Sequence, residues 1–138
     1  SMPAPNVISY LRNNRAVDSE VEATIRDRQD LIERVLAQAA GRPGAVVVAG
    51  DMNSTERSRV YRLLSEHHVD AYRTAGLGLG HTFPAQGGRW RGIPILPRLL
   101  RIDMIFHSLD MVALESHVGP ALGDSDHRPV TARLAWRE

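Results

Sequence analysis

The feature that most constrains the fold of this chain is a short apolar run followed directly by polar residues. Ala45 to Ala49 reads Ala-Val-Val-Val-Ala between glycines, and a β-branched run of this length predicts a strand buried on both faces. Gly50-Asp51-Met52-Asn53-Ser54 follows directly, and a helix near Arg57 to His67 comes next. Polar residues between a buried strand and a helix lie where α/β folds place their functional sites. The pattern therefore indicates an α/β domain with a site at Asp51 and Asn53.

The other predicted elements surround this junction. Apolar residues at helical spacing predict a helix from Ser19 to about Ala40, ended by Gly41 and Pro43, whereas Ser1 to Asp18 is expected to be extended or loop. Val69 to Arg73 is expected to be a short strand, and Gln86 to Leu100 a long loop. Alternation predicts strands at Arg101–His107, at its expected antiparallel neighbour Met111–Val118, and at Pro129–Trp136.

Composition narrows the class of protein. The chain has 138 residues, 43% of them hydrophobic, which is enough for one domain with a real core. Its net charge of +1, from 17 basic and 16 acidic residues, excludes a polyelectrolyte. The absence of cysteine excludes disulfides and thiolate chemistry. No apolar run approaches the ~20 residues needed to span a bilayer.

Three polar clusters lie beside predicted strands: Asp51 with Asn53, then Asp103, then Asp126 with His127. Each alone is weak evidence, because a single Asp before a helix is usually a cap and Asp-His in a loop is usually a turn. Together, carboxylates, an amide and an imidazole make up the set that a metal-assisted hydrolase needs.

These residues carry a resemblance. Val-Val-Val-Ala-Gly-Asp51-Met-Asn53-Ser resembles the Gly-Asp-x-Asn motif of the endonuclease/exonuclease/phosphatase superfamily, which has the deoxyribonuclease I-like fold. Arg101-Ile-Asp103-Met-Ile-Phe and Ser125-Asp126-His127-Arg-Pro-Val resemble the two motifs that follow it, and Gly80-His-Thr82-Phe-Pro84 resembles a turn between them. Order and spacing match from about Ala45 to Glu138.

The resemblance implies only part of the family's fold. Family members are four-layer α/β/β/α sandwiches built from two similar halves, and residues 1–138 resemble the C-terminal half. We therefore expect an α/β (α+β) half-sandwich with one mixed, mostly antiparallel sheet and helices on one face. The asparagine and the metal-binding glutamate that members bring from the first half have no counterpart here.

The resemblance also implies a role for each site residue. Asp51 would orient and deprotonate the attacking water, and Asn53 would hold Asp51 and a phosphate oxygen. His127 would donate to the phosphoryl oxygen while Asp103 holds its ring. Asp126 would be a ligand, direct or in the surrounding shell, for Mg²⁺ or Mn²⁺, which suit an oxygen donor set.

The substrate depends on the segment from Arg89 to Arg101. Its arginines alternate with large apolar residues, a pattern that suits a lipid-linked phosphate, a nucleic acid, or simple packing on another part of the protein. Some bacterial relatives with a similar Thr-Phe-Pro turn act on lipid-carried phosphate. The candidate substrate contacts are Thr82, Arg89, Arg91 and Arg101.

Two functions remain open. The chain is either the catalytic portion of a metal-dependent phosphoesterase, acting as a nuclease or phosphatase, or a non-catalytic domain that binds phosphate or a partner. Its localisation is not indicated by the sequence. A half-sandwich would leave one sheet face apolar and uncovered, so we also expect a homodimer or domain exchange that covers it.

Overall fold

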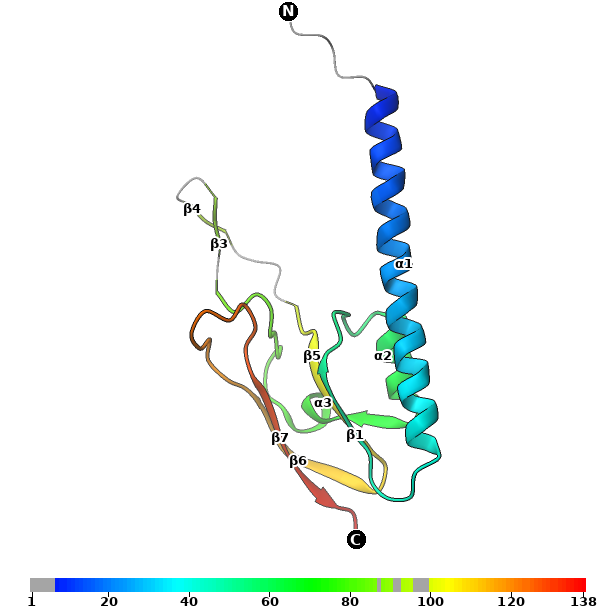
Figure 1. The fold of residues 1–138 in the computed structure, drawn as a ribbon. Helices are drawn as coiled ribbons and strands as arrows, with labels where there is room; N and C mark the ends of the chain where they lie inside the picture. The colour runs from blue at the N-terminus through cyan, green and yellow to red at the C-terminus, as the bar shows by residue number, and fades with distance from the viewer. Residues whose placement is uncertain (1–6, 87, 91–92, 96–99) are drawn as a thin grey trace, which may run out of the picture.

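The computed structural model describes residues 7–86, 88–90, 93–95 and 100–138, with side chains over 19–86 and 100–138. Figure 1 shows one long helix beside a body of short strands and helices. In chain order the elements are α1 (Val7–Ala40), β1 (Val47–Asp51), α2 (Arg59–Ser65), β2 (His68–Asp70), α3 (Ala71–Ala75), β3 (Gly88–Trp90), β4 (Ile93–Ile95), β5 (Asp103–Ser108), β6 (Met111–Val118) and β7 (Val130–Trp136). No helix in these described ranges is both long and apolar enough to cross a bilayer.

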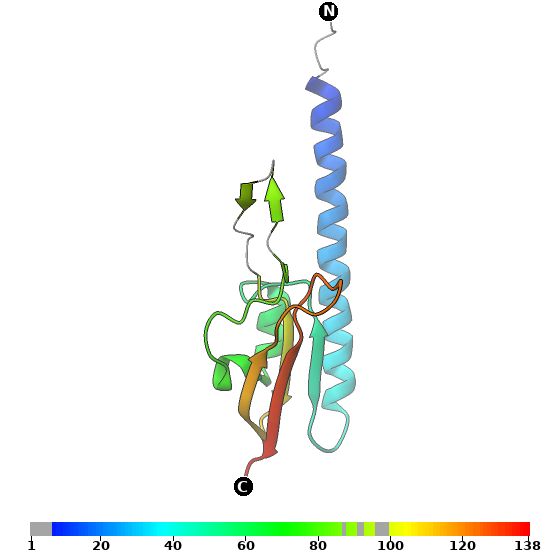
Figure 2. The same ribbon diagram turned by 90° about the vertical axis from the view of Figure 1, so that its left-hand side faces the viewer.

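Helix α1 begins earlier than the sequence pattern suggested. It runs through Ser19 without a break and starts at Val7, so the expectation of an extended segment up to Asp18 was wrong. Extending an existing helix adds one hydrogen bond for each residue fixed, whereas starting a new one is costly. Residues between Val7 and Asp18 include no glycine or proline to stop that extension. The N-terminal part of α1 projects beyond the body (Figures 1 and 2).

The central sheet has the strand order β1-β5-β2, with both pairs antiparallel. The alternation predicted for β5 is confirmed, since Met104 is 1% exposed and Phe106 0%. These side chains pack with Ile32 from α1 and with Val60 and Leu64 from α2. Helices α1 and α2 therefore cover one face of this sheet (Figure 1).

Strand β6 does not pair with β5 as the alternation suggested. It pairs with β7, from Met111 opposite Trp136 to Val118 opposite Val130. The expectation was wrong because β1 and β2 already occupy both edges of β5. Figures 1 and 2 place the β6–β7 pair on the side of the central sheet away from α1 and α2.

The expected mixed α/β class with antiparallel strands and helices is confirmed. The described strands form one three-stranded and two two-stranded sheets rather than a single sheet. Two local predictions also change. Asp70 ends β2 and caps α3, so the strand expected over Val69–Arg73 is shorter. The long loop expected over Gln86–Leu100 contains the antiparallel pair β3–β4.

Candidate active site

The register of the central sheet brings two carboxylates together. Asp51 ends β1 directly opposite Asp103, which begins β5. Side chains opposite each other on an antiparallel pair have Cβ atoms about 4.5–5.5 Å apart, and like charges there are destabilising. This end of the sheet therefore has negative charge that a neighbouring cation would stabilise.

His127 lies between the two carboxylates. Its Nδ1 is 2.8 Å from Asp103 Oδ2, and its Nε2 is 4.0 Å from Asp51 Oδ2. Because a carboxylate only accepts, Nδ1 carries the proton in the bond to Asp103, and Nε2 is left facing Asp51. Within the described residues, ligand atoms of Asp51, Asp103 and His127 all lie within 4.8 Å of one another.

The loop after β1 fixes the orientation of Asp51. Asn53 donates to Asp51 through both its backbone N–H, 2.7 Å from Oδ1, and its side-chain amide, 3.0 Å from Oδ2. Asn53 has a φ of 47°, a left-handed conformation that asparagine tolerates better than most residues. Arg28 of α1 donates to the Asn53 carbonyl at 3.0 Å, which ties this loop to the long helix.

A hollow of about 400 Å³ lies at this cluster. Its polar side is formed by Asp51, Asp103, Ser125, His127 and Arg128, and its other side by Gly50, Met104, Leu122, Pro129 and Val130. One rim of the sheet thus combines acceptors, an imidazole and a guanidinium around a space large enough for a phosphate group.

The electrostatics of the hollow favour the imidazolium form of His127. The hydrogen bond to Asp103 raises the pKa of His127 above 6.5, and the charges of Asp103, Asp51 and Asp126 raise it further, while burial opposes them. A protonated imidazole at Nε2 can donate to an anionic oxygen in the hollow.

Asp126 occupies a different position from the clustered carboxylates. It is exposed, and its backbone carbonyl accepts from Ala85 N at 2.6 Å. It is not among the described residues whose ligand atoms lie within 4.8 Å of one another. Its effect on the pKa of His127 places its charge near the site.

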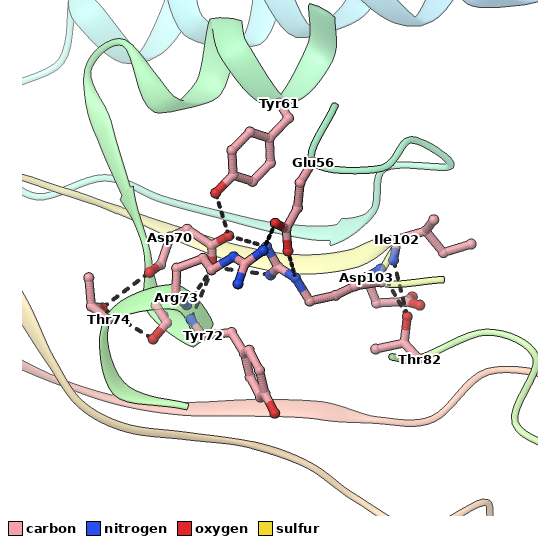
Figure 3. Close-up of polar contacts among 11 residues, drawn as sticks. Glu56, Tyr61, Asp70, Tyr72, Arg73, Thr74, Thr82, Ile102 and Asp103 are labelled. Atoms are coloured by element: carbon pink, nitrogen blue, oxygen red, sulfur yellow. Dashed lines mark hydrogen bonds and ion pairs between the residues drawn. The ribbon is translucent and has the colours of Figure 1, made fainter. Parts of the chain in front are cut away.

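Two of the expected substrate contacts, Thr82 and Arg101, are buried in this structure. Thr82 is 0% exposed, and its hydroxyl accepts from the backbone N–H groups of Ile102 and Asp103 at 3.3 and 3.2 Å (Figure 3). A fully buried hydroxyl that already accepts two bonds has no surface to offer a ligand. In this structure the Thr82 hydroxyl binds the backbone at the start of β5, and its expected substrate contact stays a prediction.

Arg101 is likewise internal, with its side chain 5% exposed. It donates to Glu56 at 2.6 Å and makes a two-point ion pair with Asp70, whose side chain is 4% exposed. The rings of Tyr61 and Tyr72 lie 6.0 and 5.7 Å from its guanidinium carbon. The Arg101 guanidinium is thus already held by two carboxylates inside the protein, and its expected substrate role stays a prediction.

The remaining candidates give a mixed result. The side chains of Arg89 and Arg91 lie outside the described residues, so their role stays a prediction. Sequence reasoning missed Phe83, whose ring centroid lies 4.9 Å from that of His127. The Thr-Phe-Pro turn was noticed in the sequence, but nothing local indicated that its aromatic ring would reach His127.

The mixed α/β fold thus places two carboxylates and an imidazole together at one rim of its central sheet. The sequence profile of the Endonuclease/Exonuclease/phosphatase family matches residues 3–127, and the chain belongs to this family. By its description, this family groups endonucleases, exonucleases and phosphatases.

Solved structures agree on the fold. A functionally unknown conserved protein from Enterococcus faecalis V583 matches with a TM-score of 0.67 and 20% identity, over 82% of this chain and 46% of that one. An endonuclease/exonuclease/phosphatase from Bacteroides vulgatus matches with 0.59 and 26%, over 84% and 45%. The Bacteroides thetaiotaomicron mannosyl-6-phosphatase matches with 0.59 and 20%, over 83% and 46%.

The chain therefore spans less than half the length of each of these structures. No curated protein gave a significant match.

Proposed function

We propose that this chain is the C-terminal half of a phosphoesterase domain and carries most of its catalytic side chains. The observation that carries the proposal is the 2.8 Å Asp103–His127 pair beside Asp51, whose orientation Asn53 fixes. Hydrolysis of a phosphate ester requires an oriented water molecule, stabilisation of the charge on the phosphoryl oxygens and stabilisation of the leaving oxygen. The constellation supports the first two, and a bound divalent cation would support the third.

Each side chain has one role in the proposed reaction. Asp51 accepts a proton from the attacking water, because its carboxylate faces the hollow and Asn53 holds it. His127 donates from Nε2 to a phosphoryl oxygen as negative charge develops there. Asp103 holds the His127 ring and favours its protonated form, and Asn53 adds an amide donor.

A divalent cation fits this site chemically. The carboxylate oxygens of the site are ligands that both Mg²⁺ and Mn²⁺ accept. When bound, such an ion would neutralise charge on the phosphoryl group. We propose that Asp126 and the clustered carboxylates hold it.

The substrate is proposed to be a phosphate ester. The sequence analysis leaves two substrate classes open, a nucleic acid and a lipid-linked phosphate. One of the structural neighbours is named as a mannosyl-6-phosphatase. A small phosphate ester is therefore a third substrate class to include in a substrate screen. The β3–β4 pair rises from the same end of the body as the site (Figure 1), and we propose that Arg89 and Arg91 on this segment contact the substrate.

The test is hydrolysis of a chromogenic phosphodiester in the presence of Mn²⁺. Asp51→Ala should reduce turnover by about 100-fold or more, the usual range for losing a general base. Asp27→Ala, on the exposed surface of α1, is the matched control and should match the parent chain. Equal rates for Asp51→Ala and the parent would overturn the catalytic proposal, and phosphate binding without turnover would favour a binding domain.

A further inference from the structure

The segment from Thr82 to Ala85 lies between the two parts of the chain that carry Asp103 and His127. On one side, Thr82 N and Phe83 N donate to the Leu100 carbonyl at 2.8 and 3.0 Å, and Leu100 N donates to the Phe83 carbonyl at 2.7 Å. On the other side, Arg128 N donates to the Thr82 carbonyl at 2.8 Å, and Ala85 N donates to the Asp126 carbonyl at 2.6 Å. The segment therefore links the start of β5 to the loop of His127.

Thr82 adds a side-chain contact on the Asp103 side. Its hydroxyl accepts from Ile102 N and Asp103 N in a fully buried position (Figure 3). Without that oxygen, both N–H groups would lose this buried acceptor, which costs free energy. The hydroxyl thus fixes the backbone from which the Asp103 carboxylate extends.

Phe83 adds a side-chain contact on the His127 side. The two rings are 4.9 Å apart at an interplanar angle of 48°. The imidazole has its Nδ1 bonded to Asp103, and the neighbouring phenyl ring limits the directions in which it can tilt. Neighbouring residues of one segment therefore constrain both partners of the Asp103–His127 pair.

We propose that Thr82 and Phe83 are positioning residues, which together set the placement of Asp103 relative to His127. The catalytic part of this inference rests on the proposed function, whereas the placement itself does not. Neither residue needs to touch the substrate. The effect is expected on turnover more than on substrate affinity, because misplacement of a reacting group by about 1 Å can cost up to about 100-fold in rate.

The test compares Thr82→Val with Thr82→Ser. Valine keeps the shape and removes the hydroxyl, whereas serine restores it. In Thr82→Val, the Asp103 amide should exchange faster with solvent, and the downfield imidazole N–H signal of His127 should broaden or disappear. Turnover should fall by about 10- to 100-fold with KM little changed, and Thr82→Ser should restore all three readouts.

Thr74→Val is the matched control, since the Thr74 hydroxyl also bonds to backbone, donating to carbonyls of Asp70 and Ala71 at 3.1 and 3.2 Å. It should leave the His127 signal and turnover unchanged. If Thr82→Val does not fold, Phe83→Leu with Phe83→Tyr as its conservative partner tests the same inference at His127.

The outcomes separate this inference from the proposed function. Absence of turnover in the parent chain would contradict the proposed function. The Asp103 amide and His127 imidazole signals would still test whether Thr82 and Phe83 set the placement of Asp103 relative to His127. An unchanged His127 signal in folded Thr82→Val and Phe83→Leu would overturn the inference. Lower thermal stability with unchanged site signals would likewise overturn it, because it would show a purely structural role.

Discussion

The protonation of His127 makes both the charge of the site and the stability of the fold depend on pH. Its pKa is raised above 6.5, first by the hydrogen bond to Asp103 and then by nearby carboxylate charges. A raised folded-state pKa means that protonated His127 stabilises the fold fully below about pH 6.5, and that this stabilisation is lost as pH rises through the folded-state pKa. Asp103→Asn should lower the pKa of His127 and weaken this pH dependence.

An NMR titration of the His127 ring checks this prediction, together with denaturant unfolding at about pH 6 and about pH 8. Asp110→Asn serves as the control, because Asp110 is exposed and bonds to Ser108. An identical His127 pKa in the parent and Asp103→Asn would show that the Asp103 contact does not set it.

Gly80 and Gly78 have similar backbone conformations but differ in how much space a side chain at each position would have. Both have positive φ, 67° and 81°. A Cβ at Gly80 would lie 2.3 Å from the Tyr72 ring, whereas one at Gly78 would meet nothing within 4 Å. Gly78→Ala should cost about 1–2 kcal/mol from its backbone conformation alone. Gly80→Ala should cost clearly more in chemical denaturation, and equal costs would show that Tyr72 moves aside freely.

Local patterns selected candidate residues that the structure brings together, but they did not indicate which residues pair inside the protein. Asp51, Asp103 and His127 were chosen from the sequence because each follows or begins a patterned strand or a motif. The internal ion pairs of Arg101 were not predicted, because its partners Asp70 and Glu56 are 31 and 45 residues away in the chain. A basic residue in a motif does not indicate from the sequence alone whether its charge is already paired.

The ion pairs of Arg101 join β2, β5 and the loop before α2. Removing one partner of a buried pair leaves an uncompensated charge, so Arg101→Met should destabilise the fold by about 3–5 kcal/mol. Arg133→Met, which breaks an exposed pair with Glu115 at 2.7 Å, should cost less than about 1 kcal/mol. Urea unfolding of both variants checks this contrast. A stable Arg101→Met chain with weakened substrate binding would instead restore the substrate role.

Elements with a strong local period were predictable, whereas strand partners were not. A strand near Ala45–Ala49, a helix within Arg57–His67 and the alternation of β5 follow from nearby residues. The expectation that the first strand is buried on both faces was wrong, because it lies at the edge of the sheet as β1 and Val47 is 49% exposed. The pairing of β6 with β7 depends on which edges of β5 are already occupied, and that is a property of the assembled sheet. The early start of α1 was missed because helix extension depends on neighbouring turns more than on a regular apolar pattern.

At the scale of the whole molecule, the exposed apolar side chains among the described residues include some on α1 and one on the central sheet. Val21 and Ile25 on α1 are 52% and 44% exposed, while Ile32 further along the same helix is 8% exposed. On the central sheet, Val47 is 49% exposed. The structural neighbours are more than twice as long as the part that this chain matches. We propose that a second copy of the chain covers the sheet surface by pairing or exchange when the chain is alone in solution.

Strand β1 is the part of the sheet most open to such pairing. Among the described residues it pairs with β5 on one edge, and its other edge offers unpaired backbone groups. Val47 and Ala49 lie on the face of β1 opposite the core residue Val48. A lysine on an edge strand opposes pairing with another chain, because its charge would have to be buried.

Val47→Lys should therefore weaken self-association. Val21→Lys, which replaces an equally exposed valine on α1, should not. Sedimentation velocity over a range of concentrations measures both. A parent chain that stays monomeric at every concentration would contradict the proposed self-association. A dimer that Val21→Lys disrupts and Val47→Lys does not would place the association surface on α1 instead of β1.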